Sequence, residues 1–267
     1  MQIIVPVFNA FDALAACVGT LERHSSQAEV VFINDASTDE RIVPFLEGAC
    51  KSKPSWAFVQ NQSNLGFVKT ANRGLKLTNG HSILLNSDTL VTTGWLDGLT
   101  YAAFNCDNVG TATPWSNNAE ICSYPKTLQN NKLPSDIDAF SAELQQKHQA
   151  SYPEIPTGVG FCMLVTKQAK NQVGYLDEQT FDHGYGEEND YSLRVKQAGL
   201  RNVLCDNVYV AHVGNQSFKD LDLKPDESTM NRLLAKHPEY AKLISEFIET
   251  DALASLRESI IAKIDHF

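Results

Sequence analysis

The sequence predicts an α/β fold with a mostly parallel central sheet, helices on both faces of that sheet and a C-terminal helical appendage. Two observations lead to this prediction. Short apolar runs typical of buried strands alternate with segments whose apolar residues recur at the helical period. Polar residues also follow the first strands, at the position where ligands bind in open parallel sheets. We therefore expect these polar residues to converge on one edge of the sheet.

The N-terminal part of the chain alternates strands and helices. The predicted strands are 3–7, 30–33, 57–59 and 82–85. The helix after the first strand carries apolar residues from Phe11 to Leu21 at the helical period, and Asn9 is its expected N-cap. A second helix is expected after Ser37, and a third follows the turn at 64–67.

The later part of the chain is less regular. A helix is expected to begin at Trp95 and another over 187–198, with further strands at 109–113, 160–165 and 203–210. Residues 114–156 mix prolines with asparagines, which is typical of a lid or binding loop rather than core. We expect one α/β domain over 1–218, with 114–156 as an acceptor or lid insertion, and a helical appendage over 219–267.

Composition limits the classes of partner. The chain has 22 basic and 32 acidic residues and a formal net charge of -10, without a Lys/Arg run. Nucleic acid and anionic membranes are therefore poor general partners. The 6 cysteines show no metal-binding spacing, and neither a secretory leader nor a transmembrane stretch is evident. We expect reduced thiols and a cytoplasmic protein, with a peripheral location at the inner face of the membrane as the alternative.

Two carboxylates follow predicted strands and are candidate ligand-binding groups. Asp88 ends the turn Asn86-Ser87-Asp88, where it can hold Mg²⁺ or Mn²⁺, or only cap the turn. Asp35 can accept a hydrogen bond from a nucleobase or cap the next helix. Arg73 can face phosphates or be a solvated helix arginine.

The segment 184–190 concentrates acidic residues at a helix start. Glu187, Glu188 and Asp190 lie in its first turn, directly after two glycines. Acids are favoured there by the helix dipole, so capping is one interpretation. Three acids exceed what capping needs, and their mutual repulsion raises at least one pKa toward the range of a general base. The glycines let a second substrate approach closely.

Other motifs are either isolated or missing. His212 follows the last predicted strand; a lone histidine there is a packed residue or a metal ligand, depending on its position relative to Asp88. The first strand continues as Pro6-Val7-Phe8-Asn9 instead of a dinucleotide-binding glycine motif. A P-loop and a hydrolase serine elbow are also missing, which disfavours those enzyme classes.

Taken together, these motifs resemble the inverting family 2 glycosyltransferases of the GT-A fold, including bacterial polysaccharide and rhamnosyl-type transferases. The resemblance runs in order through residues 2–218. The motifs that carry it are Ile3-Ile4-Val5-Pro6-Val7-Phe8-Asn9, Ile33-Asn34-Asp35-Ala36-Ser37-Thr38-Asp39, Asn64-Leu65-Gly66-Phe67 with Arg73, Leu84-Leu85-Asn86-Ser87-Asp88-Thr89, Gly184-Tyr185-Gly186-Glu187-Glu188-Asn189-Asp190 and His212. Two positions depart from the family pattern, because Asn86 replaces the first Asp of D-x-D and the Glu-Asp pair is Glu187-Glu188.

The resemblance implies a role for each motif. Metal ligation falls on Asp88 and His212, with Mn²⁺ or Mg²⁺ as the cofactor, and Glu188 is the expected base, with Glu187 and Asp190 beside it. The residues expected to bind a UDP, dTDP or GDP sugar are Pro6, Val7, Phe8, Asn9, Asp35, Asn64, Gly66, Arg73, Asn86 and Ser87. Trp115, Asn118 and Tyr124 are candidate sugar contacts.

The resemblance also implies the reaction and its partners. We expect single-displacement transfer with inversion to the hydroxyl of a glycan or lipid-linked oligosaccharide, in bacterial polysaccharide or glycoconjugate synthesis. The C-terminal helices are expected to pack on the core, with contact to a membrane or partner domain as the other possibility. A nucleotidyltransferase would need a basic, Gly-rich loop that this chain lacks. A catalytically inactive binding module of a larger synthase remains the alternative function.

Overall fold

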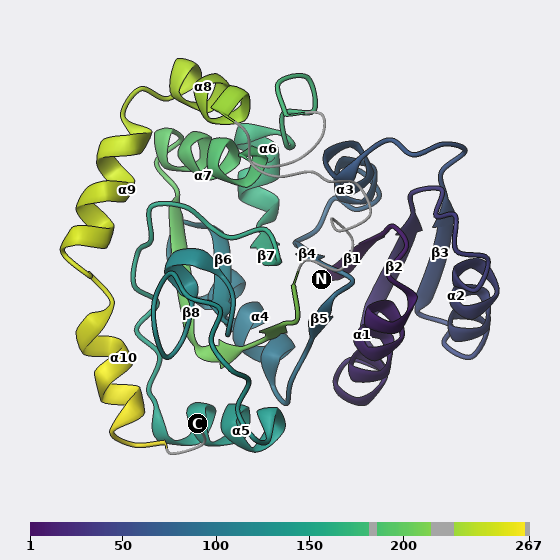
Figure 1. The fold of residues 1–267 in the computed structure, drawn as a ribbon, viewed down its shortest axis with the longest axis horizontal. Coiled ribbons are helices and arrows are strands. Elements are labelled where there is room, and N and C mark those ends of the chain that lie inside the picture. Colours follow the sequence, from purple (N-terminus) through teal and green to yellow (C-terminus); the bar gives the residue numbers. More distant parts are fainter. Residues whose placement is uncertain (182–185, 215–226, 265–267) are drawn as a thin grey trace.

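A seven-stranded sheet runs through the molecule in the order β3-β2-β1-β4-β7-β6-β8 (Figure 1). This computed structural model describes residues 1–181, 186–214 and 227–264. The strands of the sheet are β1 (Gln2–Val7), β2 (Glu29–Asn34), β3 (Trp56–Gln60), β4 (Ser82–Leu85), β6 (Val109–Trp115), β7 (Cys162–Val165) and β8 (Arg201–Tyr209). Two further strands, β5 (Thr89–Leu90) and β9 (Ala211–His212), form a separate antiparallel ribbon.

The sheet is mostly parallel, as the sequence predicts. Strand β1 pairs in parallel with β2 and β4, and β2 pairs in parallel with β3. Strand β7 alone among these seven runs antiparallel to both of its neighbours, β4 and β6. Because β1, β2, β3 and β4 share one direction, the polar residues that follow them meet at one edge of the sheet.

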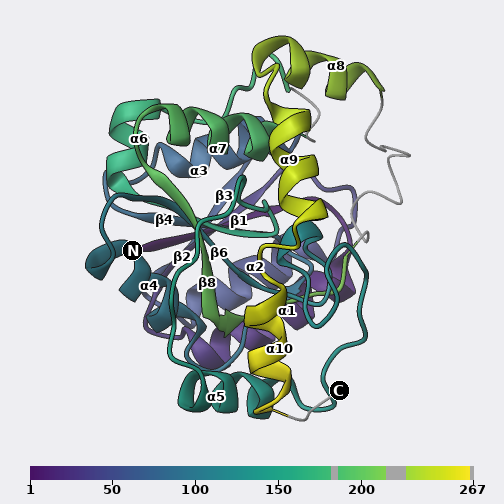
Figure 2. The same ribbon diagram turned by 90° about the vertical axis from the view of Figure 1, so that its left-hand side faces the viewer.

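Helices cover both faces of the sheet (Figures 1 and 2). They are α1 (Phe11–His24), α2 (Ile42–Lys51), α3 (Phe67–Leu75), α4 (Trp95–Asn105), α5 (Ile137–Lys147), α6 (Lys167–Val173), α7 (Glu187–Gln197), α8 (Glu227–Lys236), α9 (Tyr240–Glu249) and α10 (Ala254–Ile261), with a 3-10 turn η1 (Glu120–Cys122).

The two faces of the sheet form two hydrophobic clusters. Ile3 and Val5 of β1 pack with α1, α2, α4 and α5 on one face, whereas Ile4 packs with α3, α6 and α7 on the other. Successive side chains of a strand point to opposite faces, so a strand covered on both sides needs a continuous apolar run. The uninterrupted apolar sequence at 3–7 has this physical cause.

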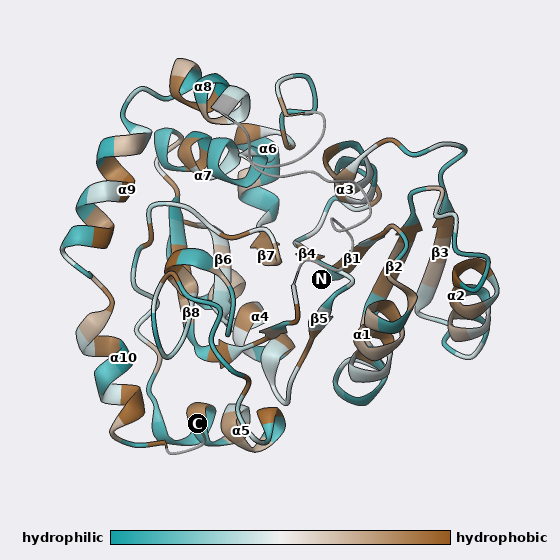
Figure 3. Ribbon diagram, viewed as in Figure 1, coloured by the Kyte–Doolittle hydropathy of each residue, from teal (hydrophilic) through white to brown (hydrophobic). Residues whose placement is uncertain are grey.

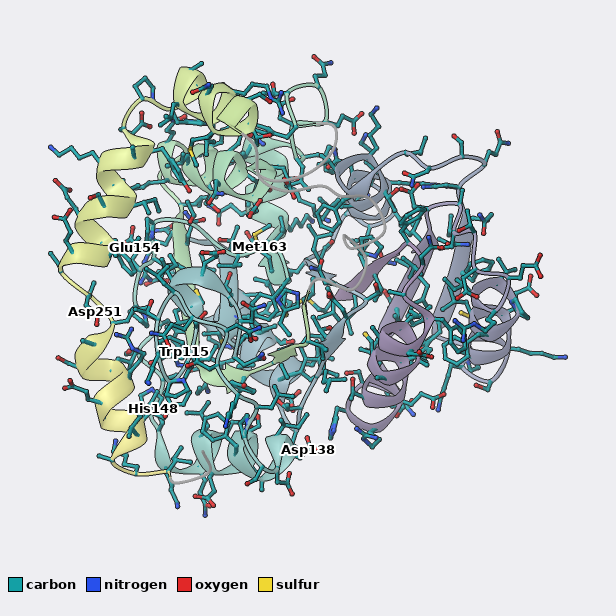
Figure 4. The ribbon with its side chains drawn as sticks, in the orientation of Figure 1. Trp115, Asp138, His148, Glu154, Met163 and Asp251 are labelled. Carbon is teal, nitrogen blue, oxygen red and sulfur yellow. The ribbon has the colours of Figure 1, made fainter. Side chains whose placement is uncertain are left out.

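The segment 114–156 differs from the sequence expectation, because much of it belongs to the core. Trp115 and Tyr124 are each 1% exposed, and Phe140 and Leu144 of α5 are also buried. Figure 4 shows Trp115 within the body of the molecule. The expectation of a loop rather than core is therefore wrong for these residues, and Trp115 and Tyr124 are too buried to contact a bound sugar. The role of this segment in acceptor binding stays a prediction.

The C-terminal helices lie along one side of the molecule, with α8 beside α7 and with α9 and α10 leading away from it (Figure 1). Hydrophobic and hydrophilic residues alternate along α9 and α10 (Figure 3). Leu233, Leu253 and Ile260 are buried against the rest of the protein, so the appendage packs on the core as expected. The boundary expected at 218 and 219 lies outside the described residues. Among the helices that the structure describes, none is long and apolar enough to cross a membrane.

Candidate active site

A network of side-chain hydrogen bonds joins the ends of β1 and β2. The Oδ1 of Asn9 accepts hydrogen bonds from the backbone N–H groups of Thr38 and Asp39, at 2.9 and 3.2 Å. Asn9 also donates its own backbone N–H to the Ser37 hydroxyl at 2.9 Å. Asn9 is therefore not the N-cap of α1, because its side chain binds the loop after β2 and the cap position falls on Ala10, without a side-chain hydrogen bond.

Asp35 organises the next loop. Its carboxylate accepts hydrogen bonds from the backbone N–H groups of Leu65 and Gly66, both at 2.8 Å, and from the amide of Asn61 at 2.7 Å. Gly66 has φ 83°, a backbone conformation that favours glycine. Asp35 is 4% exposed and holds the turn before α3, and its contact with a nucleobase stays a prediction. It does not cap the next helix.

Asn64 and Arg73 stabilise this same loop. The side chain of Asn64 accepts a hydrogen bond from the backbone N–H of Gly66 at 2.9 Å. Arg73 is exposed on α3 and donates hydrogen bonds to the Gln60 carbonyl and to the side chain of Asn61. The loops after β2 and β3 are thus linked through Asp35, Asn61 and Arg73, and Arg73 lies at the sheet edge where the sequence places a phosphate-binding group.

The turn after β4 brings Asp88 to His212. Thr89 pairs with His212 across the β5–β9 ribbon, and the backbone N–H of Val213 donates to the Asp88 carbonyl at 3.0 Å. As a result, Oδ1 of Asp88 lies 3.4 Å from Nε2 of His212. Asn86 donates its backbone N–H to the Phe161 carbonyl at 2.8 Å, and Ser87 is buried. His212 therefore lies beside Asp88. The sequence alone left this position open, and the interpretation of His212 as a metal ligand depended on it.

The surroundings of His212 determine which ring nitrogen faces Asp88. Nδ1 lies 2.8 Å from the carbonyl oxygen of Asn118, which can only accept, so Nδ1 carries a proton. In the neutral ring, Nε2 then carries no proton, and its lone pair lies on the side of Asp88. Burial alone would lower the pKa of His212, but the contact with Asp88 and the hydrogen bond to Asn118 raise that pKa above its ordinary value. The ring also stacks on Phe161, with centroids 5.3 Å apart.

Asp88 and His212 form a donor set that fits a divalent cation. One carboxylate oxygen and one imidazole nitrogen are acceptable ligands for Mn²⁺, and such ions are commonly bound by few side chains together with substrate phosphates. In the part of the chain that the structure describes, no group of three or more His, Cys, Asp or Glu side chains is arranged to hold a metal. A cation at this pair would therefore take its remaining ligands from substrate and water.

Glu187 and Glu188 begin α7 and differ from ordinary surface acids. Gly186 precedes them with φ 93°, and Gly184 and Tyr185 of the motif lie outside the described residues. Burial, together with the nearby charge of Glu188, holds the pKa of Glu187 well above its usual range. Burial also raises the pKa of Glu188. One oxygen of each acid is buried without a hydrogen-bond partner among the described residues.

Asp190 has a different environment, which does not support a catalytic role. Its carboxylate is fully buried and lies 2.6 Å from Lys236 Nζ, 2.9 Å from His237 Nε2 and 2.8 Å from Arg194 Nε. With three partners on its two oxygens, Asp190 holds α7 against α8. These contacts give Asp190 a structural role, and its assignment as a catalytic acid stays a prediction. Three acids in one helical turn led to the prediction of catalytic acids, but Asp190 is in contact with the cations that pack around α7.

Sequence reasoning predicted Asn61 on the polar edge, because it directly follows the third strand, but gave it no role of its own. It missed Asn117 as a residue of the site. Asn61 joins Asp35, Thr70 and Arg73, and Asn117 binds the backbone of His212. Both are buried.

Solved structures with similar folds extend over nearly the whole chain. GalNAc-T7 with UDP, GalNAc and Mn²⁺ is 16% identical with a TM-score of 0.63, covering 97% of this chain and 54% of that chain. A mannosyltransferase from Pyrobaculum calidifontis with GDP-Man and Mn²⁺ is 13% identical with a TM-score of 0.57, covering 98% and 85%. S. aureus TarS 1–349 is 15% identical with a TM-score of 0.57, covering 88% and 71%. This chain thus spans about half the length of the GalNAc-T7 chain.

The comparisons confirm the GT-A fold that the resemblance implies. No curated protein matches the sequence. A family model described as glycosyl transferase family 2 matches residues 2–172, which is more than half of the chain and includes β1 to β7. With the strand order, the polar edge and the turn at Asp88 all in place, the chain belongs to glycosyl transferase family 2.

Proposed function

We propose that this protein is a metal-dependent, inverting glycosyltransferase that moves a sugar from a nucleoside-diphosphate sugar to an acceptor hydroxyl, in polysaccharide or glycoconjugate synthesis. The observation that carries the proposal is the pairing of Asp88 Oδ1 with His212 Nε2 at 3.4 Å, beyond the end of β4. Membership of the family and two fold neighbours solved with Mn²⁺ and a UDP or GDP ligand support it.

The donor would bind along the edge formed by the first four strands. Pro6, Val7, Phe8 and Asn9 continue β1, and Asp35 with the turn at 64–66 lies next to them. Arg73 places a positive charge at this edge, and Asn86 and Ser87 lead to Asp88. A divalent cation bound by Asp88 and His212 would neutralise charge that develops on the departing diphosphate.

Glu188 is the proposed base. Its carboxylate takes the proton from the acceptor hydroxyl, and the hydroxyl oxygen forms the new bond to the anomeric carbon. The bond from that carbon to the diphosphate oxygen breaks, and its electron pair leaves with the nucleoside diphosphate. Attack opposite the leaving group inverts the anomeric configuration. Glu188 lies beside Gly160, where an added Cβ would be 3.8 Å from the Glu188 Cβ, within ordinary van der Waals contact.

The test separates donor binding from transfer. Binding of UDP-, dTDP- and GDP-sugars is measured by thermal shift with and without Mn²⁺, and the donor that responds is then used for transfer assays. Asp88→Ala is expected to abolish Mn²⁺-dependent donor binding. Glu188→Gln is expected to keep donor affinity near that of the wild type and to lower kcat by about 10²- to 10⁴-fold, the usual contribution of a general base.

Two results would contradict the proposal. Equal loss of binding and transfer in both variants would remove the division of roles between Asp88 and Glu188. Mn²⁺-dependent donor binding without transfer to any acceptor would favour a binding module that lacks activity.

A further inference from the structure

The side chain of Asn117 binds both backbone polar groups of His212. Its Oδ1 accepts the His212 N–H at 2.8 Å, and its Nδ2 donates to the His212 carbonyl at 3.0 Å. Asn117 is 4% exposed, so water does not compete freely for these bonds. This two-point contact fixes where the His212 backbone lies, in the way that a neighbouring strand would.

The next residue acts on the ring of the same histidine. The Asn118 carbonyl is the partner of His212 Nδ1 at 2.8 Å, so it favours the tautomer with its proton on Nδ1. The side chain of Asn118 lies over Gly214, where an added Cβ would be 2.7 Å from Nδ2 of Asn118. Asn117 and Asn118 together contact the backbone, the ring and the following turn of 212–214.

Asn117 is itself held in place by the loop that follows it. The Asn117 carbonyl accepts the backbone N–H of Asn131 at 2.8 Å and the side-chain Nδ2 of Asn131 at 3.2 Å. The same Nδ2 donates to the carbonyl of Lys126 at 2.8 Å. The contact to His212 therefore comes from a loop with its own internal hydrogen bonds, and not from an isolated flexible side chain.

We propose that Asn117 is a positioning residue, which holds His212 so that Nε2 faces Asp88 with its lone pair free. The inference rests on the proposed function, because it assigns to His212 the role of metal ligand. It connects the first part of the segment 114–156, expected as an acceptor or lid insertion, with the site proposed for the leaving diphosphate. Partners that orient a ligating histidine typically change metal affinity by about 10- to 100-fold when they are mutated.

Two variants and one matched control test this role in the full chain. Asn117→Ala removes both hydrogen bonds, and Asn117→Leu does so while keeping most of the side-chain volume. Asn72 makes the same two-point contact elsewhere: Oδ1 accepts the Leu176 N–H and Nδ2 donates to the Leu176 carbonyl, both at 2.9 Å. Asn72→Ala therefore removes the same two-point contact at a different place in the fold, together with a hydrogen bond to Glu178 Oε2.

The first readout is the Kd of Mn²⁺ alone, measured by electron paramagnetic resonance of the free ion, with Tm recorded for each variant. We expect both Asn117 variants to weaken Mn²⁺ binding about 10-fold or more. Asn72→Ala should lower Tm and leave the Mn²⁺ Kd unchanged. Folded Asn117 variants that bind Mn²⁺ with the wild-type Kd would overturn the proposal.

The second readout does not depend on a metal. The ¹⁵N chemical shifts of the neutral His212 ring, identified by their loss in His212→Gln, report which nitrogen carries the proton. We expect Nδ1–H in the wild type. We expect a loss of that preference in Asn117→Leu, because the His212 backbone is then no longer held where Nδ1 reaches the Asn118 carbonyl. An unchanged tautomer in this variant would refute the positioning role. If the wild type binds no Mn²⁺, the metal site of the proposed function fails, and the tautomer still decides whether Asn117 positions His212.

Discussion

Glu187 and Glu188 are consecutive acids at the start of α7, but their environments differ. The pKa of Glu187 lies well above its usual range because of burial and the nearby charge of Glu188. Burial also raises the pKa of Glu188, but backbone hydrogen bonds and a hydrogen bond with Glu187 oppose the rise. We therefore expect Glu188 to lose its proton first and Glu187 to stay protonated beside it. This expected order is consistent with the proposal of Glu188 as the base.

This order predicts different results for two conservative variants. Glu187→Gln should keep most of the transfer activity, because glutamine resembles a protonated glutamate and can still donate to Glu188. Glu188→Gln should lose transfer, as expected for the base. The measurement is kcat for each variant under saturating donor. Loss of activity in Glu187→Gln, with activity kept in Glu188→Gln, would exchange the two roles.

Glu120 predicts a change in the pH profile. The negative charge of Glu120 adds to the raised pKa of Glu188. A base with a raised pKa is active above that pKa, so transfer is lost as the pH falls through it. Glu120→Gln removes the neighbouring charge, and the acidic limb of kcat/KM against pH should move to lower pH. A limb that stays in place or moves upward would show that Glu120 does not act on the base.

At the scale of the elements, Asp190 decides how α7 is held. Burial alone would raise its pKa, but the hydrogen bonds from Lys236 and His237 and the charge of Arg194 lower it. A carboxylate with a lowered pKa stabilises the fold above the ordinary aspartate pKa, and this stabilisation is lost as the pH falls through the lowered value. The anchor joins the helix that carries Glu187 and Glu188 to the C-terminal helix α8.

Removing this anchor should destabilise the protein. Asp190→Ala leaves the buried His237 and Arg194 without this carboxylate, while Lys236 keeps its pair with Asp177, and we expect the free energy of unfolding to fall by about 3 kcal/mol. The control is Lys242→Met, which breaks the exposed ion pair with Glu246 on α9. This variant should change the free energy of unfolding by less than about 0.5 kcal/mol. Urea unfolding measures both variants. An Asp190→Ala protein as stable as the control would leave α7 held by apolar contacts alone.

The sequence predicted the elements with strong local patterns and missed those without them. The apolar run at 82–85 coincides with β4, and the run at 3–7 differs from β1 by one residue at its start. Strands β5 and β9 have two residues each, too few to show a period, and they create the contact of Asp88 with His212. The sequence could suggest that contact only through the family resemblance.

Helices α5 and α6 were not predicted from the sequence. Their N-capping residues indicate a helix start, but hydrophobic periodicity alone does not take such residues into account. Asp136 accepts hydrogen bonds from the N–H groups of Asp138 and Ala139 at the start of α5, and Thr166 does the same for Ala169 at the start of α6. Prolines and asparagines around 114–156 instead suggested a loop. In the site, the sequence did not reveal the packing contacts of Asp190 with Lys236 and His237, because these residues lie far away in the sequence.

At the scale of the whole molecule, α8 and α10 each bury a residue against the core, Leu233 and Ile260, whereas α9 buries none. Ile260 is 0% exposed, whereas its neighbour Ile261 is 49% exposed. Ile260→Ala should lower the free energy of unfolding by about 2–5 kcal/mol, because it leaves a cavity between α10 and the core. Ile261→Ala should change it by less than about 0.5 kcal/mol. Equal, small effects in thermal or urea unfolding would show that α10 contributes little to stability.

The β5–β9 ribbon has a consequence for the order in which the chain acquires its function during synthesis. Asp88 leaves the ribosome long before His212, which follows β8, the strand that pairs with β6 at the end of the sheet. A nascent chain that ended at residue 172, where the family match ends, would contain Asp88 but not His212. The ability to hold a cation at both residues would therefore appear only when the last strands are placed.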